Sequence, residues 1–269
     1  MRGKIVVITG ATSGIGEVTA IELAARGARI VFVARDRKRA EALLPQLHGA
    51  GHRYHLADLS TLAEMKRVGA AIAAAEPRID VLMNNAGALF ARRIETVDGL
   101  EATFAVNHMA YFVLTEALRA NIPSGGRIVN TASAAHWGAS LNFDDLQSKQ
   151  RYERYGAYQR SKLCNILFTR ALAKRLRGVT ANCFHPGFVA TRFGDSAGGA
   201  TAVAFKVAKL TAISPAEGAT TMIYLATSEE IGATSGEYFN RCAVESPSAQ
   251  ARDDKAAEKL WAVSEQIAR

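Results

Sequence analysis

The chain has 269 residues, of which 49% are hydrophobic and 22% charged, with 3 cysteines and a formal net charge of +8. A chain of this size buries enough apolar surface to fold without disulfides, and three widely spaced cysteines fit neither a disulfide framework nor a zinc site, so we expect a cytoplasmic protein without a metal. The short apolar run after Lys4 is not long enough to cross a membrane and lacks a signal-peptide pattern, so no integral membrane segment is expected.

Short β-branched runs alternate with longer helical stretches along most of the chain. The predicted strands are residues 4–9, 29–33, 54–56, 81–83, 127–130 and 179–184, and the predicted helices are residues 17–26, 62–75, 100–119 and 157–176. The strands show no polar alternation, which is typical of a parallel sheet with helices on both faces. The sequence therefore predicts an α/β fold with a Rossmann-type, doubly wound parallel sheet.

No repeat, linker or composition break marks a second domain, so a single domain is expected over residues 1–269. Two stretches, 134–155 and 188–213, fall outside the alternation, and irregular stretches of this length often cover binding sites. We expect residues 188–213 to form a substrate lid and residues 246–269 to form a helical C-terminal tail.

A glycine-rich turn joins the first predicted strand to the first predicted helix. Its sequence, Thr9 to Gly16, has glycines at Gly10, Gly14 and Gly16. Such glycines let a backbone approach a pyrophosphate, whose charge is met by N–H groups at the start of the helix. An unliganded βα turn is the alternative, although the context favours a nucleotide site.

The end of the second predicted strand bears on the choice of cofactor. An NAD site needs a carboxylate there, about 20 residues beyond the glycines, to accept from the adenosine ribose 2′-OH. This chain has Ala34 and then Arg35, whose planar fork suits a 2′-phosphate instead. The pattern predicts NADP(H) in preference to NAD(H), with a plain basic helix start as the alternative.

Tyr158 and Lys162 lie four residues apart in a predicted helix and so share one face. An ammonium beside a phenol favours the phenolate and brings its pKa toward the working range of an acid–base catalyst. A surface pair without a catalytic role can have the same spacing, so the spacing alone does not identify a catalytic pair, and the neighbouring motifs are needed to favour one.

Positive charge is concentrated between Lys149 and Arg177, where nine basic residues accompany one acid, Glu153. A solvated helix face is favoured over nucleic-acid binding, because no zinc-finger spacing or aromatic RNA-binding motif accompanies these charges. We therefore expect no nucleic-acid partner.

Taken in chain order, these motifs resemble the short-chain dehydrogenase/reductase family over essentially the whole chain. The motifs are Thr9-Gly10-x-x-x-Gly14-x-Gly16, Asp58-Leu59, Asn84-Asn85-Ala86-Gly87, Asn107, Ser133, Tyr158-x-x-x-Lys162, Pro186-Gly187 and Thr191. Each motif alone is weak, but the ordered set is specific.

The resemblance implies a catalytic tetrad and a cofactor site. Tyr158 would exchange a proton with the substrate oxygen, Ser133 would hydrogen-bond that oxygen, Lys162 would bind the nicotinamide ribose and keep Tyr158 acidic, and Asn107 would support a water relay to Lys162. Asp58 would contact the adenine. The implied cofactor-binding residues are Gly10, Thr12, Ser13, Gly14, Ile15, Gly16, Arg35, Asp58, Leu59, Asn85, Ala86, Gly87, Tyr158, Lys162, Pro186, Gly187, Val189 and Thr191.

Within this family the chain is most similar to the retinol dehydrogenase-like branch. The similarity rests on the segments 142–146 and 158–168, on Gly236-Glu237-Tyr238-Phe239 and on Lys259-Leu260-Trp261. The chain departs from many animal members in having Thr12 in place of Asn, and we expect it to have no N-terminal membrane anchor of the kind those members carry.

The resulting prediction is an NADP(H)-dependent oxidoreductase for a lipophilic aldehyde, ketone or alcohol. A dinucleotide-binding regulatory protein on the same fold and a basic nucleic-acid-binding protein are the alternatives, and a homodimer or homotetramer is expected. His136 and Trp137 either touch substrate or cap a loop, and His185 is expected to be a satisfied strand-end histidine.

The stretch expected to form the lid has an apolar lining. Its members are Phe188, Phe193, Val203, Phe205, Val207 and Leu210. Because Val203, Val207 and Leu210 recur at helical spacing with Lys206 and Lys209 off that face, a basic amphipathic helix on a membrane surface is the alternative to a lid.

Overall fold

Eight strands form one sheet in the computed structural model, which describes residues 1–189 and 213–269. Their order is β3-β2-β1-β4-β5-β6-β7-β8, and all pairs are parallel except β7 with β8. The strands are β1 (Ile5–Thr9), β2 (Arg29–Ala34), β3 (Arg53–Leu56), β4 (Val81–Asn84), β5 (Arg127–Thr131), β6 (Thr180–His185), β7 (Tyr238–Asn240) and β8 (Ala243–Val244). The order reverses between β1 and β4, which is where doubly wound sheets bind ligands.

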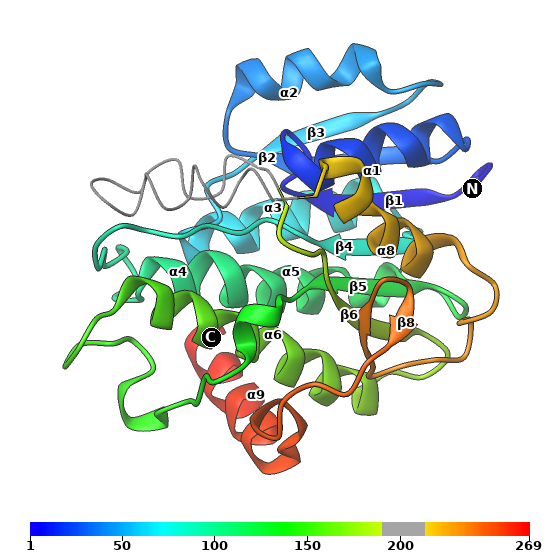
Figure 1. The fold of residues 1–269 in the computed structure, drawn as a ribbon. Helices are drawn as coiled ribbons and strands as arrows, with labels where there is room; N and C mark the ends of the chain where they lie inside the picture. The colour runs from blue at the N-terminus through cyan, green and yellow to red at the C-terminus, as the bar shows by residue number, and fades with distance from the viewer. Residues whose placement is uncertain (190–212) are drawn as a thin grey trace.

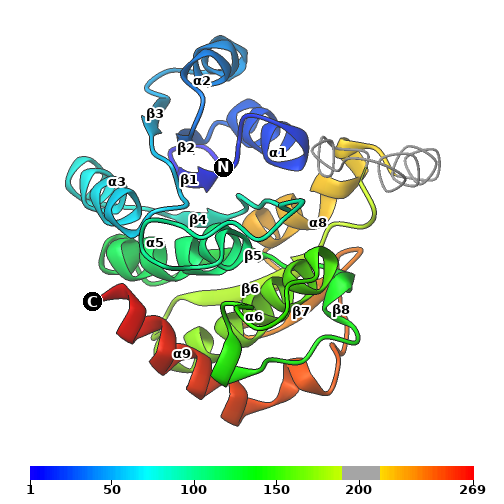
Figure 2. The same ribbon diagram turned by 90° about the vertical axis from the view of Figure 1, so that its left-hand side faces the viewer.

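Helices cover both faces of the sheet (Figures 1 and 2). One layer holds α1 (Gly14–Ala25), α2 (Arg37–Leu43) and α8 (Pro215–Thr227), and the other holds α3 (Leu62–Ala75), α5 (Ala110–Leu118) and α6 (Arg154–Arg175). The C-terminal helix α9 (Asp254–Ala268) packs against the outside of α6. The single-domain, doubly wound α/β fold predicted from the sequence is confirmed.

The two helical layers explain why the strands show no polar alternation. Val7 and Val31 point into the core under α3, α5 and α6, whereas their neighbours Val6 and Ile30 point into the core under α1 and α8. Helices cover both faces, so successive residues in the middle of β1 (Val6, Val7, Ile8) and of β2 (residues 30–33) are all apolar and buried.

One predicted helix contains a π-helical turn. Residues 100–119 form the short helix α4 (Ala102–Phe104), then a π-helical turn over Ala105–Met109, then α5. The widened turn contains Asn107, whose side-chain amide bonds the backbone of Ala88 in the loop after β4. Such turns often occur at functional sites, and this one depends on a contact that local periodicity does not reveal.

The basic stretch is partly neutralised by α9. Arg170 and Lys174 both pair with Asp254, at 2.9 and 2.8 Å, and Arg175 pairs with Glu258. These pairs neutralise three of the nine basic residues at the contact between α6 and α9, which weakens the nucleic-acid interpretation.

Replacing Trp261 by Leu should lower the free energy of unfolding by about 1–2 kcal/mol. The indole is 8% exposed, stacks on Phe168 with ring centroids 5.9 Å apart and covers the Arg175 guanidinium at 4.2 Å. Urea unfolding measures the change. Trp137→Leu is the matched control, because that indole is 51% exposed, and equal losses in the two variants would contradict the packing role of Trp261.

Candidate active site

A cleft of about 1270 Å³ opens at the carboxyl ends of the parallel strands. Most of the residues predicted to bind a cofactor line it: Gly10, Thr12, Ser13, Gly14, Ile15, Arg35, Asp58, Leu59, Asn85, Ala86, Gly87, Tyr158, Lys162, Pro186, Gly187 and Val189, together with Ser133. Gly16 and Asn107 lie behind its wall, and Thr191 lies outside the described residues. The fold thus brings together, at one edge of the sheet, residues from the loops after six strands and from helix α6.

The glycine-rich turn is held against the loop after β4. A Cβ on Gly10, whose φ is +69°, would lie 2.8 Å from Ala86 Cα, and a Cβ on Gly16 would collide with the Gly10 carbonyl oxygen. Thr9 Oγ1 accepts from the backbone N–H groups of Asn85 and Ala86, each at 2.9 Å. Glycine is therefore required for this close packing of two loops.

The start of α1 offers a cradle for an anion. Ser13 is the N-cap residue, yet its side chain makes no capping hydrogen bond, and Gly14 and Ile15 line the cleft. Free N–H groups at a helix N-terminus favour phosphate. With the bare glycine turn beside it, this end of the cleft fits the pyrophosphate of a dinucleotide.

Two arginines lie at the end of β2. Arg35 is exposed and lines the cleft, and Arg39 from α2 lines it as well. Asp36 between them accepts from the backbone N–H of Arg39 at 3.2 Å and so caps α2. The sequence prediction missed Arg39, although its position four residues after Arg35 was a usable signal once a helix is placed there.

Tyr158 and Lys162 lie one turn apart on α6 at the floor of the cleft. Lys162 is 3% exposed, its Nζ donates to the Thr131 carbonyl at 2.9 Å, and Nζ lies 5.7 Å from the centroid of the Tyr158 ring. The Tyr111 ring lies on another side of Nζ, at 6.0 Å. The ammonium is thus enclosed by two phenol rings and one carbonyl.

Burial shifts the pKa values of these two groups in opposite directions. It raises the pKa of Tyr158 to about 12, against the effect of a hydrogen bond with the Ser133 side chain, and it lowers the pKa of Lys162 to about 7. In the protein without cofactor, burial is thus the main influence on the pKa of Tyr158, and the effect expected of Lys162 stays a prediction. A lysine that is neutral above pH 7 carries no charge at the pH where the phenol ionises.

Ser133 follows β5 and begins the 3-10 turn η4 (Ala134–His136). Its Oγ accepts from the Ala135 N–H at 3.1 Å and shares a hydrogen bond with Tyr158. Strand β5 and helix α6 thereby place a hydroxyl and a phenol side by side.

Asn107 supports the site from behind. Its Oδ1 accepts from the Ala88 N–H at 2.7 Å, and its Nδ2 donates to the Ala88 carbonyl and to Ser161 Oγ, at 3.0 and 2.9 Å. The side chain is fully buried and these bonds occupy its amide. In this structure Asn107 holds the loop that carries Gly87 over Lys162.

The contacts of His185 and His136, the two histidines singled out in the sequence, define their roles. His185 lines the cleft, and its Nδ1 accepts from the Gly187 N–H at 3.3 Å. His136 is fully buried with hydrogen bonds at both ring nitrogens, while Trp137 beside it is 51% exposed. Neither Trp137 nor His136 lines the cleft.

Phe188 and Val189 line the cleft and are the last described residues before position 190. Phe188 is 47% exposed at the rim, and Val189 pairs with Ile213 across the gap. The predicted lid residues Phe193, Val203, Phe205, Val207 and Leu210, with Lys206 and Lys209, lie outside the described residues.

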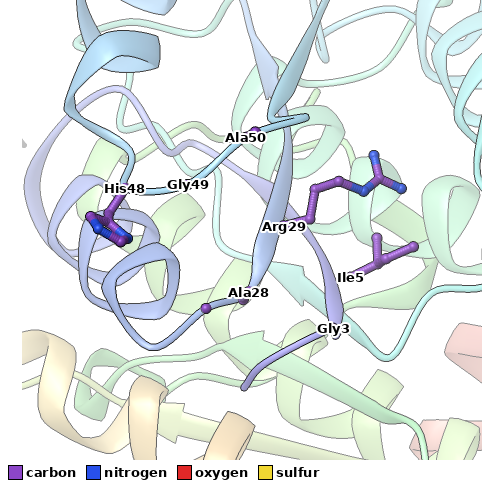
Figure 3. Close-up of a pocket in the computed structure, with 8 residues that line it drawn as sticks. Gly3, Ile5, Ala28, Arg29, His48, Gly49 and Ala50 are labelled. Carbon is purple, nitrogen blue, oxygen red and sulfur yellow. The ribbon is translucent and has the colours of Figure 1, made fainter.

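A second, smaller hollow lies at the opposite edge of the sheet (Figure 3). Its one arginine, Arg29, extends away from His48 and pairs with the buried carboxylate of Glu76. Because Arg29 is already paired with Glu76, the residues lining this hollow offer a ligand fewer polar groups than those of the cleft.

The described residues contain no group of three or more potential ligands that could hold a metal ion. Among the same residues, no helix has the length and apolar character needed to cross a membrane.

Lys162→Met should raise the Tm of the protein without cofactor, more at pH 6 than at pH 9. Burial lowers the pKa of Lys162 from 10.5 to about 7, so the unfolded chain binds more protons between these values and the lysine destabilises the fold most below pH 7. A shift of one pKa unit corresponds to roughly 1.4 kcal/mol in the free energy of unfolding, and 1 kcal/mol shifts Tm by roughly 2–4 °C. A gain of several degrees in Tm is therefore expected at pH 6. Calorimetry against exposed Lys255→Met checks this, and a gain independent of pH would contradict it.

Comparison with known proteins gives a consistent result. Residues 4–200 match the family model described as "short chain dehydrogenase". Human "Retinol dehydrogenase 14" is 41% identical, covering 98% of this chain and 86% of that protein, and human "Retinol dehydrogenase 13" is 38% identical, covering 98% and 84%.

Solved structures share the fold. The crystal structure of an uncharacterized protein from Mycobacterium paratuberculosis has a TM-score of 0.83 and 32% identity, covering 99% of this chain and 94% of that one. A short chain dehydrogenase from Burkholderia cenocepacia, in complex with NADP, has a TM-score of 0.71 and 28% identity, covering 90% and 99%.

Proposed function

The chain belongs to the short-chain dehydrogenase/reductase family, in its retinol dehydrogenase-like branch, and on that premise we propose that this oxidoreductase uses NADP(H) to interconvert a lipophilic aldehyde or ketone and its alcohol. One observation carries the proposal. Ser133, Tyr158 and Lys162 face the same cleft as the glycine-rich turn and Arg35, so a dinucleotide bound along the sheet edge would end beside an acid–base group.

The residues fit the parts of the cofactor from one end of the cleft to the other. Gly10 to Ile15 would hold the pyrophosphate, Arg35 the 2′-phosphate and Asp58 with Leu59 the adenine. Asn85 to Gly87 would line the middle of the cleft. Pro186, Gly187 and Val189, with Thr191 beyond the described residues, would hold the nicotinamide end. The cofactor, when bound, supplies or accepts the hydride.

The chain's own residues supply the proton and the orientation. Ser133 would hydrogen-bond the substrate oxygen, and Tyr158 would give that oxygen a proton in reduction and remove it in oxidation. Burial keeps the pKa of Tyr158 near 12, so the phenol is protonated at neutral pH as carbonyl reduction requires. Lys162 would hold the ribose, and Asn107 would maintain the loop over Lys162.

A lipophilic substrate is favoured by apolar side chains that line the cleft. Leu89, Phe90, Ile94, Tyr155 and Phe188 are among its lining residues. Apolar pockets with a few polar groups are typical of sites for small hydrophobic molecules. Medium-chain or long-chain aldehydes and bulky ketones should therefore have higher kcat/KM than short polar carbonyls.

Phe188→Ala should reduce, several-fold, the ratio of kcat/KM for lipophilic carbonyls to kcat/KM for short polar ones. One lost apolar contact is worth roughly 1–3 kcal/mol, and KM for NADPH should stay unchanged. NADPH oxidation with a carbonyl panel measures both. Val244→Ala is the control, because that side chain is 55% exposed and outside the cleft. A panel in which only small hydrophilic carbonyls react would contradict the lipophilic assignment.

The same panel tests the alternative of a dinucleotide-binding regulatory protein. Such a protein would bind NADPH and turn over none of the carbonyls or alcohols. Retention of Tyr158 and Lys162 within one cleft favours an enzyme. A homodimer or homotetramer stays a prediction.

A further inference from the structure

His136 links the Ser133 loop to the C-terminal segment through both of its ring nitrogens. Nδ1 lies 2.7 Å from the Ser133 carbonyl oxygen, and Nε2 lies 3.1 Å from the backbone nitrogen of Ser248. A carbonyl only accepts and a backbone N–H only donates, so Nδ1 carries the proton and Nε2 carries a lone pair. The two partners thus define one neutral tautomer.

The His136 ring is buried and held between two aromatic rings. His136 is fully buried, its ring meets the Tyr238 ring edge-on with centroids 5.1 Å apart, and the Trp137 ring lies 5.2 Å away. Ser248 is 2% exposed and begins the turn that leads into α9. The histidine therefore joins the loop after β5 to the strand β7 and to the chain before α9.

The carbonyl that His136 holds belongs to the residue whose hydroxyl meets Tyr158. It receives the Nδ1–H and also the backbone N–H of His136, at 3.2 Å. Two donors on one carbonyl fix the plane of the peptide that joins Ser133 to Ala134. The N–H of the next peptide, that of Ala135, donates to Ser133 Oγ. Rotation of that plane would move the hydroxyl relative to Tyr158.

We propose that His136 is a positioning residue for the reaction, which holds the Ser133 hydroxyl in register with Tyr158 through the Nδ1–H bond to the Ser133 carbonyl. The inference rests on the proposed function, because it gives Ser133 a role in turnover. His136 acts through Ser133 and does not itself line the cleft.

Two amide variants separate this role from simple packing. In His136→Asn the amide occupies the place of Nδ1 and still donates to the Ser133 carbonyl, whereas the link to Ser248 is lost. In His136→Gln the amide reaches the place of Nε2 and still accepts from Ser248, whereas the link to Ser133 is lost. Both variants remove the ring from its contact with Tyr238, so both should lose a similar amount of Tm.

The expected result is a kcat about tenfold lower in His136→Gln, the scale of one lost orienting hydrogen bond, and within about twofold of wild type in His136→Asn. KM for NADPH should stay within about twofold in both variants. Ser248→Ala is the control, since it keeps the backbone N–H and removes only the Oγ that receives the Ala251 N–H, so its Tm falls and its kcat does not.

A pH profile gives an independent readout. The titratable groups that face the ring among the described residues are Glu245, His185 and Tyr238. Protonation of Nε2 would oppose the Ser248 N–H but leave the Nδ1–H bond to the Ser133 carbonyl in place. Wild type and His136→Asn, which cannot ionise, should therefore show the same dependence of kcat on acid pH. A loss of kcat at acid pH that is present in wild type and absent in His136→Asn would place the effect on the Ser248 link and contradict the proposal.

Equal kcat in the Asn and Gln variants, or losses of kcat that follow Tm in both, would overturn the proposal. Failure of the proposed function is recognised separately, by wild type without turnover or by a Tyr158→Phe variant as active as wild type.

Discussion

Tyr158→Phe should remove turnover almost completely while leaving NADPH binding nearly intact. The phenol is the one acid that meets the Ser133 hydroxyl at the floor of the cleft within the described residues, and its ring stays in place in the variant. Loss of a positioned acid–base group costs typically 10²–10⁴-fold in rate. Steady-state NADPH oxidation gives kcat, and quenching of protein fluorescence by NADPH gives Kd.

The neighbouring Tyr155 provides a matched control. Its ring lies 6.3 Å from that of Tyr158, it lines the same cleft and it is 48% exposed. Tyr155→Phe should keep kcat within about twofold, because no step assigns it a proton. Near-normal kcat in Tyr158→Phe, or equal losses in the two variants, would show that Tyr158 is not the acid–base group.

Arg35→Ala should remove most of the preference for NADPH over NADH. The Ala34 side chain has no acceptor for a ribose 2′-OH, and Arg35 is exposed and lines the cleft at the end proposed to hold the adenosine. A hydrogen bond to a charged group contributes about 1.5–3 kcal/mol, or roughly 10–150-fold in affinity. The change should be found in KM for NADPH, measured beside KM for NADH.

Arg37→Ala is the control for this experiment. Arg37 lies two residues away, bonds the Tyr54 hydroxyl at 3.4 Å, pairs with Glu41 and does not line the cleft. Arg39 also lines that end of the cleft. If Arg35→Ala removes only a small part of the preference for NADPH over NADH, the double variant Arg35→Ala/Arg39→Ala should remove the rest. Wild type that uses NADH as efficiently as NADPH would refute the argument from the end of β2.

The architecture could be predicted from the sequence because it depends on short-range patterns. The central strands β1, β2 and β4 are mainly apolar because they are buried on both faces. The helices between strands are long enough for crossovers, and the periods of helix and strand differ. The same holds for Tyr158 and Lys162, since any α-helix places residues four apart on one face. The short strands β7 and β8 and the helix α8 were missed, because their apolar signal is brief or lies beside the irregular stretch.

Long-range contacts decided the rest. The π-helical turn at Asn107 depends on the backbone of Ala88, 19 residues earlier, and the tautomer of His136 depends on Ser248, 112 residues later. Neither partner is marked by spacing. The pKa values of Tyr158 and Lys162 move in opposite directions because the folded chain removes both groups from water. The sequence by itself determined which residues could meet at the sheet edge, and only the tertiary structure determined how deeply they are buried and what holds them there.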